Sequence, residues 1–219
     1  MITLKDIKEN KDISEYIRRA DCSLIALGYT EHSFAHVGKV VSATEYIMQT
    51  LGFSDHDIEL AKIAAYMHDI GNLVNRVDHS QSGAIMAFRI LDHMKMDAAD
   101  IATVVTAIGN HDEGTGVPVN EIAAALILAD KSDVRRSRVR NRDEASFDIH
   151  DRVNYSAKQS HLIISENKEE IVLELEIDSN YSSVMDYFEI FMKRMILCRK
   201  AAERLGMRFR LKINGQVLL

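Results

Sequence analysis

The chain has 219 residues, of which 47% are hydrophobic and 27% are charged. This composition is typical of one soluble globular domain, and it excludes a disordered chain, collagen and a coiled-coil rod. The longest strictly apolar run covers residues 122–129, whereas a membrane-spanning helix needs about 20 residues. Because no basic-then-apolar leader opens the sequence, we expect a cytoplasmic protein that does not enter a membrane.

The net charge and the cysteine content restrict which classes of partner and which types of metal ligand we expect. The net charge is -6, whereas a general nucleic-acid binder needs excess Lys and Arg to hold phosphate. Cys22 and Cys198 are too few for a disulfide framework or a thiolate zinc site. Any metal must therefore be bound by histidines, of which there are nine, and by carboxylates.

Apolar residues spaced by three and four predict helices over the first two thirds of the chain. One proline and ten glycines favour long helices joined by short turns. Asn10 or Asp12 can cap the first helix, Asp57 the third and Asn120 the last. We expect helices over residues 10–27, 37–51, 57–71, 82–95, 98–110 and 120–133, with Gly28, Gly52 and Gly71 ending the first three.

The last third of the chain has a different pattern. Two β-rich runs, 160–165 and 171–177, flank a polar turn and predict a hairpin. A helix over 184–205 follows. The Asn214-Gly215 pair between two further apolar runs is a strong signal for a second hairpin.

These elements predict a mainly α-helical fold with a small C-terminal antiparallel β-sheet, an α+β protein overall. Residues 1–142 form the helical body, and residues 143–219 form the hairpins and the long helix packed on it. No linker is long enough to demand two independent domains, so we expect one compact unit. The loop 143–159 is a candidate for closing over the site described next.

Several His and Asp residues fall in the apolar phase of the predicted helices. Asp130 continues the apolar stripe of its helix, so its carboxylate should be buried. An unpaired buried charge costs on the order of several kcal/mol and therefore needs a cation. His68 and His111 are likewise in phase with apolar residues, Asp69 is next to His68, and His36 lies just before the valine face of its helix. Each alone is consistent with a core or capping residue, but together they indicate a metal that collects them.

The other histidines carry less information. His32 lies one helical turn before His36 and could share its face, so its role stays open. Polar neighbours predict solvent-facing side chains for His56, His93, His150 and His161.

The order His36, His68-Asp69 and Asp130 resembles the HD-domain metal-dependent phosphohydrolase superfamily, which is named for its adjacent His-Asp pair. His68-Asp69-Ile70-Gly71 matches the superfamily signature at every position, and His36 followed by Val40 resembles its first-ligand motif. The similarity covers about residues 20–135. It implies an all-helical fold whose core binds one or two divalent metals, and its members mostly hydrolyse phosphate esters of nucleotides.

Two further segments resemble the HD proteins that hold two metals. Residues 78–84 are similar to their His-x-x-x-Gly segment, and residues 110–118 are similar to the stretch that names the HD-GYP cyclic-dinucleotide phosphodiesterases. The resemblance implies a two-metal centre with His79 and His111 among its ligands, but not a cyclic-dinucleotide substrate. Three positions depart from that group: Asp112 replaces a second His, Val117 a Tyr and Asn72 a Lys.

The ligand types indicate the metal chemistry. Imidazoles and carboxylates without a thiolate suit a divalent transition metal, Fe, Mn, Co or Ni, with Mg as a further option. One or two ions per chain are expected. Asp69, between the two sub-sites in sequence, is the expected bridge and a catalytic residue. A metal-activated hydroxide then attacks phosphorus in line.

Basic residues near Asp130 could contact the phosphate. Lys131 can meet it, or can be a solvent-facing lysine in the last helical turn. Residues 135–142 hold five arginines, and guanidinium groups bind phosphate oxygens through two hydrogen bonds. We assign substrate binding to Arg135 or Arg136, since all five cannot reach one pocket.

We expect a metal-dependent phosphohydrolase that cleaves a phosphate ester of a nucleotide or a similar small molecule. Two alternatives stay open: a nuclease or RNA-binding protein that uses the arginine run, and a catalytically silent, metal-binding regulatory module. The acidic net charge argues against nucleic acid. The apolar stripe with Phe188, Phe191 and Met195 allows a homodimer, or else packs on the helical body.

Overall fold

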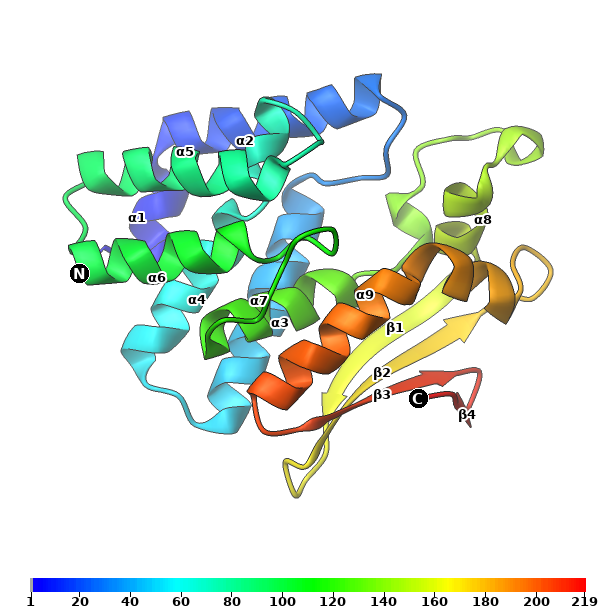
Figure 1. The fold of residues 1–219 in the computed structure, drawn as a ribbon. Coiled ribbons are helices and arrows are strands. Elements are labelled where there is room, and N and C mark those ends of the chain that lie inside the picture. The colour runs from blue at the N-terminus through cyan, green and yellow to red at the C-terminus, as the bar shows by residue number, and fades with distance from the viewer. Residues whose placement is uncertain (1) are drawn as a thin grey trace.

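The computed structural model describes residues 2–219 and has a helical body with a small sheet beside it (Figure 1). The elements of the body are α1 (Leu4–Glu9), α2 (Lys11–Ala26), α3 (Phe34–Leu51), α4 (Asp55–Met67), the 3-10 turn η1 (Ile70–Leu73), α5 (His79–His93), α6 (Ala98–Gly109) and α7 (Glu121–Ser132). The later elements are the 3-10 turns η2 (Arg136–Arg138) and η3 (Glu144–Ser146), α8 (Ile149–Ser156), β1 (Ala157–Ile164), β2 (Glu170–Ile177), α9 (Val184–Arg204), β3 (Arg208–Ile213) and β4 (Gln216–Val217).

Local capping signals place most of the helix ends. Asn10 begins α2, because its side-chain oxygen accepts hydrogen bonds from the backbone N–H groups of Asp12 and Ile13. Gly52 follows α3 with a positive φ of 83°, a conformation that glycine adopts without strain. The predicted cap of α4 is wrong by one turn: Ser54, not Asp57, is the N-cap, and its hydroxyl accepts from the Asp57 N–H.

The two short helices α1 and α8 were not predicted. They have six and eight residues, which is too few to establish an apolar period in sequence. Helix α8 and the turn η3 occupy most of the segment that we expected to be an open loop, 143–159.

The central helix of the body is α7. All residues from Ile122 to Ala129 are buried, because α7 is surrounded by α3, α4, α6 and α9. Burial on every side explains its unbroken apolar run. Within residues 2–219, no helix is both long and apolar enough to cross a membrane.

The sheet is mixed rather than antiparallel as predicted. Its strand order is β1-β2-β3-β4, and β2 and β3 are parallel, with Glu170 opposite Arg208 and Leu175 opposite Ile213. The two hairpins are antiparallel as expected. The parallel pair arises because α9 carries the chain back along the sheet before β3 starts, which is the usual function of a crossover helix.

Helix α9 packs between the helical body and the sheet. It contacts α7 on one side and β3 on the other, and it lies along one face of the sheet (Figure 1). Phe191 and Met195 are buried inside the chain, while Phe188 is half-buried. Most of the apolar stripe thus belongs to the chain's own core, and a homodimer stays a prediction.

Candidate metal centre

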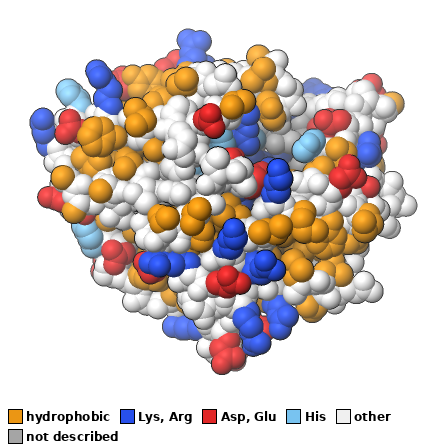
Figure 2. Space-filling model, in the orientation of Figure 1, with side chains coloured by type: hydrophobic (Ala, Val, Ile, Leu, Met, Phe, Trp, Pro, Cys, Tyr) orange, Lys and Arg blue, Asp and Glu red, His pale blue; other side chains and the backbone are white. Residues whose placement is uncertain are grey.

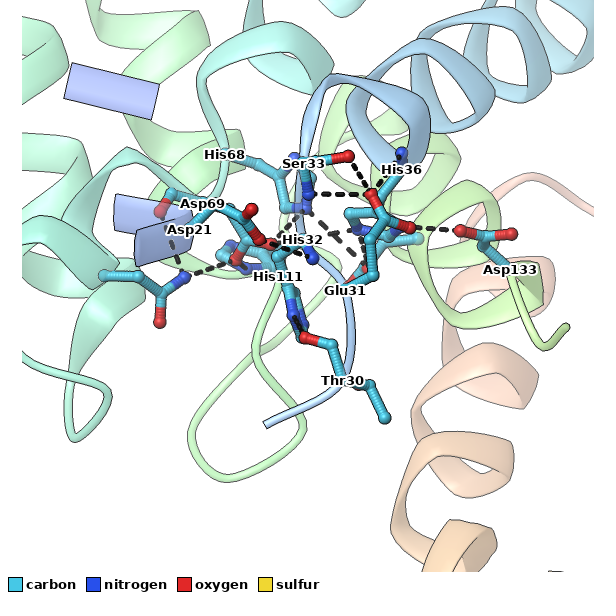
Figure 3. Close-up of polar contacts among 12 residues, drawn as sticks. Asp21, Thr30, Glu31, His32, Ser33, His36, His68, Asp69, His111 and Asp133 are labelled. Carbon is cyan, nitrogen blue, oxygen red and sulfur yellow. Dashed lines mark hydrogen bonds and ion pairs between the residues drawn. The ribbon is translucent and has the colours of Figure 1, made fainter. Parts of the chain in front are cut away.

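Helix ends bring together the six predicted metal ligands. His36 lies in the first turn of α3, His68 and Asp69 follow α4, His111 follows α6, and Asp130 is in the last turn of α7. The sixth residue, His79, is the first residue of α5, not part of a loop as expected. The four histidines are at most 3% exposed as whole residues, and the Asp69 and Asp130 side chains are 10% and 12% exposed. Figure 3 shows His36, His68, Asp69 and His111 turned toward one another.

All four imidazoles have the same hydrogen-bond arrangement. Each Nδ1 lies within hydrogen-bond distance of an oxygen that can only accept, so Nδ1 carries the proton. The acceptors are Asp133 Oδ2 for His36 at 2.7 Å, the Ala65 carbonyl for His68 at 2.8 Å, the Arg76 carbonyl for His79 at 3.1 Å and the Ile108 carbonyl for His111 at 2.6 Å. In the neutral ring, the lone pair is therefore on Nε2, as metal ligation through Nε2 requires.

Asp69 lies between two pairs of histidines. Its Oδ2 is 3.3 Å from His68 Nε2 and 3.8 Å from His36 Nε2. Its Oδ1 is 3.4 Å from His79 Nε2 and 3.8 Å from His111 Nε2. The two oxygens of one carboxylate thus face two separate groups of ring nitrogens, an arrangement suited to a bridging ligand.

These contacts define two sub-sites. The Asp130 sub-site consists of His36, His68, Asp69 and Asp130, with Asp130 Oδ1 3.3 Å from His36 Nε2 and 3.8 Å from His68 Nε2. The His79 sub-site consists of Asp69, His79 and His111. Two groups of residues have ligand atoms close enough to share one ion: His36, His68 and Asp130 fall within the Asp130 sub-site, whereas His68, Asp69 and His111 span the two sub-sites.

Unsatisfied ring nitrogens indicate that the cluster fits a cation. Among the described residues, the buried Nε2 atoms of His36 and His68 have no hydrogen-bond partner. His79 Nε2 and His111 Nε2 are 3.1 Å apart, and both rings have their proton on Nδ1, so two lone pairs face each other. Buried ring nitrogens such as the Nε2 atoms of His36 and His68 normally have a partner. A divalent transition metal, which favours imidazole and carboxylate ligands, would be that partner.

The carboxylates of the cluster are ionised. Burial raises the pKa of Asp69, but the neighbouring imidazoles, His68 first and then His111 and His79, outweigh it and hold the pKa well below its ordinary value. Burial also raises the pKa of Asp130. The neighbouring ammonium of Lys131 is the main influence that outweighs burial, so the pKa of Asp130 is well below its usual range. Burial lowers the pKa of His111. Ionised carboxylates and neutral imidazole are the forms that bind metal.

Lys131 is buried beside Asp130, so it is not the solvent-facing lysine that was one of its two predicted settings. Its side chain is 5% exposed, and its Nζ lies 2.7 Å from Asp130 Oδ2 and 2.6 Å from Glu113 Oε2. Glu113 Oε1 in turn accepts a hydrogen bond of 2.9 Å from Arg194 Nε on α9. Alternating charges thus connect α9 to the candidate ligand Asp130.

The arginine run is tied to other parts of the chain. Arg135 forms ion pairs with Glu31 and Asp133, and Arg138 is buried with its Nη1 donating to the Asp133 carbonyl. Arg136 donates to the Tyr155 carbonyl, and its guanidinium lies 4.4 Å from the Tyr155 ring centroid. The structure places neither Arg135 nor Arg136 in contact with the six clustered residues.

Two residues that support the cluster were missed from the sequence. Asp133 orients His36 through the Nδ1 contact, and burial, which raises its pKa, is outweighed by that hydrogen bond and by Arg138, so its pKa is about 2. Asn72 donates from Nδ2 to Asp69 Oδ1 at 3.0 Å. The available signals were weak: Asp133 lies three residues after Asp130, and Asn72 lies one turn after Asp69.

Gly71 lets η1 approach the start of α5. A Cβ atom built at Gly71 would lie 1.9 Å from the His79 carbonyl oxygen and 2.4 Å from the Gly83 nitrogen. Only glycine fits at this distance, which sets the position of His79 relative to His68 and Asp69.

His32 lies beside the cluster. Its Nδ1 donates to the Thr30 carbonyl at 2.7 Å, and its ring centroid is 5.4 Å from that of His36. Together with Asp69 and Asn72 it lines a cavity of about 10 Å³, enough for about one water molecule. Figure 3 shows His32 next to Asp69, so it is a neighbour of the candidate ligands rather than part of either candidate group.

A hollow opens on the face of the molecule toward the ends of α5 and α6. Figure 2 shows it near the middle of this face, with Lys or Arg, Asp or Glu, and His side chains close together.

Comparison with known proteins identifies similar sequences and structures. The HD domain family model matches residues 33–189. MJ1020, an uncharacterized protein of Methanocaldococcus jannaschii, is 24% identical over 158 residues, which cover 62% of this chain and 60% of that protein. The chain thus spans less than two thirds of the length of this curated relative. A crystal structure of a predicted HD superfamily hydrolase from an uncultured Thermotogales bacterium is similar at 25% identity, with 61% of this chain and 75% of that chain covered and a TM-score of 0.45.

Proposed function

Since the chain belongs to the HD domain family, we propose that it is a metal-dependent phosphohydrolase that cleaves a phosphate ester of a nucleotide or a similar small molecule. The observation that carries this proposal is the division of Asp69 between two histidine pairs, with Oδ2 facing His36 and His68 and Oδ1 facing His79 and His111. A carboxylate between two nitrogen-rich sub-sites suits two ions held close together, a common arrangement for phosphoryl chemistry.

The chain's own residues have separate tasks in this proposal. His36, His68, Asp69 and Asp130 hold the first ion, and Asp69, His79 and His111 hold the second. Asp133 and the backbone carbonyls fix the imidazoles through Nδ1, and second contacts of this kind set ligand orientation. A bound divalent ion supplies an activated water as nucleophile and offsets charge on the phosphoryl oxygens.

Lys131 has a supporting task. Because its Nζ is shared by Asp130 Oδ2 and Glu113 Oε2, it holds one Asp130 oxygen and leaves Oδ1 for the ion. This replaces the direct phosphate contact, which was one of the two settings considered for Lys131.

The alternative functions receive less support. A nuclease or RNA-binding protein would use the arginine run, but Arg135, Arg138 and Arg140 are paired with carboxylates of the same chain. A silent regulatory module stays compatible with the cluster, because metal binding alone does not establish turnover.

The experiment is a substrate screen on purified protein loaded with Mn²⁺, Fe²⁺, Co²⁺, Ni²⁺ or Mg²⁺. Nucleoside mono-, di- and triphosphates, cyclic dinucleotides and short RNA are offered, and phosphate or nucleotide release is measured. We expect metal-dependent release from a small phosphate ester that is abolished in Asp69→Ala. Metal binding without release from any substrate would favour the regulatory module instead.

The number of ions is measured separately. His79→Ala and His111→Gln each remove one ligand of the His79 sub-site, so we expect metal content to fall from about two ions per chain towards one. The glutamine keeps much of the side-chain volume next to the core and thus separates a ligand effect from a packing effect. Unchanged metal content in both variants would show that the centre holds a single ion without them.

A further inference from the structure

Arg76 lies at the rim of the His79 sub-site. It follows η1 and precedes His79 by three residues. Its Nη1 is 3.4 Å from His79 Nε2 and 3.3 Å from Asn72 Oδ1, and its guanidinium carbon is 5.6 Å from the Tyr29 ring centroid. The side chain is half-buried, so it touches both the cluster and the surface.

The charge of Arg76 is not neutralised within the described part of the chain. Residues 2–219 provide carboxylate partners for the other basic residues around the cluster, namely Lys131, Arg135, Arg138, Arg140 and Arg194. Arg136 is turned away toward Tyr155 and Tyr181. The partners of Arg76 are an amide, an imidazole and an aromatic ring, all of them neutral. It is thus a cation beside the cluster that is available to an anion.

The contact between Arg76 and His79 cannot persist when a metal is bound. His79 Nδ1 carries its proton toward the Arg76 carbonyl, so Nε2 has one lone pair, which can accept from Arg76 or bind an ion but not both. Two cations would also repel each other at this distance. Metal binding therefore frees guanidinium N–H groups at the edge of the His79 sub-site, next to the position of the reacting group.

We propose that Arg76 is the substrate-binding residue that holds the phosphoryl group at this centre; the inference rests on the proposed phosphohydrolase function. The guanidinium offers N–H groups in a planar fork that matches two phosphate oxygens. Asn72 and the Tyr29 ring keep it at the rim while it binds. Arg76 takes the function that the sequence suggested for Arg135 or Arg136.

The test uses inorganic phosphate as the probe and the full chain loaded with Mn²⁺. Phosphate affinity is measured by calorimetry for the unaltered protein, Arg76→Ala, Arg76→Lys and Arg89→Ala. Arg89 is an exposed arginine on α5 and serves as the control for the loss of one positive charge. We expect Arg76→Ala to weaken phosphate binding at least about tenfold, the loss of one charge-assisted hydrogen bond. Arg76→Lys should recover part of the affinity, and Arg89→Ala should match the unaltered protein.

Metal content distinguishes substrate binding from a structural function. If Arg76 only positioned His79, its removal would lower the metal content. We expect the content of Arg76→Ala to be unchanged and, with an active substrate, the KM to rise more than the kcat falls. Loss of metal, unchanged phosphate affinity, or no phosphate binding by the unaltered protein would each overturn the proposal. The proposed function is tested separately in the substrate screen, and it fails if the unaltered protein shows no turnover.

Discussion

Lys131 places its ammonium nitrogen 2.7 Å from Oδ2 of Asp130, its neighbour in the chain, while both side chains are largely buried at the end of α7. The other oxygen of Asp130 faces the histidines of the Asp130 sub-site. One carboxylate thus serves a protein cation on one side and a candidate metal position on the other. Glu113 is the second carboxylate on Lys131 and is itself paired with Arg194.

Replacing Lys131 by Met should destabilise the metal-free protein. The change leaves Asp130 and Glu113 without the cation between them, and breaking a buried ion pair on one side costs about 3–5 kcal/mol. A bound divalent ion compensates the charge of Asp130, so added Mn²⁺ should raise the melting temperature more in the variant than in the unaltered protein. Thermal unfolding with and without metal measures both effects.

Lys62→Met is the matched control for this prediction. Lys62 also pairs with two carboxylates, Glu45 and Glu59, but its side chain is 18% exposed and these partners are not among the clustered residues. A lysine that keeps this contact with solvent is easier to replace than a fully buried one, so we expect a smaller loss of stability than for Lys131→Met. Equal stability loss in the two lysine variants, or an equal response to metal, would contradict the importance assigned to Lys131.

Asp133→Asn should weaken metal binding while the fold persists. Asp133 Oδ2 accepts the His36 Nδ1 proton at 2.7 Å, and loss of such a supporting carboxylate typically costs about 10–100-fold in metal affinity. Titration with Mn²⁺ followed by calorimetry gives the affinity. Asp100→Asn removes a similar carboxylate contact, 2.8 Å from His56 Nε2, at a more exposed position. If both variants bound metal as tightly as the unaltered protein, Asp133 would not support His36.

Gly71→Ala should lower stability and disturb the His79 sub-site. The new Cβ would overlap the His79 carbonyl oxygen at 1.9 Å, and forcing atoms into a packed region costs about 1–3 kcal/mol. Gly38→Ala is the control, because nothing lies within 4 Å of a Cβ at this helical position. It should stabilise α3 by about 0.5–1 kcal/mol. Chemical denaturation of both variants measures the change in the free energy of unfolding. If both substitutions lowered it, or both raised it, the close approach of η1 to α5 would not be the reason for glycine at position 71.

The two cysteines should differ in reactivity. Burial raises the pKa of Cys198 to about 12, whereas Cys22 is exposed. The thiolate is the reactive form, so Cys198 is protonated as well as covered at pH 8. We expect dithionitrobenzoate to modify one thiol per folded chain quickly and the other only after denaturation. Rapid modification of both in the folded protein would show that α9 does not protect Cys198.

Local signals in the sequence were sufficient for most elements of the fold. Side-chain caps such as Asn10 and stop residues such as Gly52 act within one helical turn, and the structure places helix ends there. The same holds for the Asn214-Gly215 turn, which joins β3 and β4. The family resemblance rested on the order of His36, His68-Asp69 and Asp130 along the chain, and the HD domain match confirms it.

The sequence also indicated which polar residues face the core. A carboxylate or imidazole in the apolar phase of a helix is visible from helical spacing alone, and His36, His68, His111 and Asp130 do meet in the structure. Their functions as metal ligands stay proposals. The spacing could not show the Nδ1 partners or the division of Asp69 between two sub-sites, because these depend on atoms from separate helices.

Only the tertiary structure decided the strand direction and the partners of the charged residues. The parallel pairing of β2 with β3 follows from the path of α9 across the sheet, which no local pattern encodes. Two of the arginines that follow Asp130 pair with distant carboxylates: Arg135 with Glu31, and Arg140 with Asp21, each across more than a hundred residues of sequence. Arg76, unremarkable in sequence, is left beside His79 without an acid. Sequence patterns report preferences over a few residues, whereas the pairing of charges depends on which segments packing brings together.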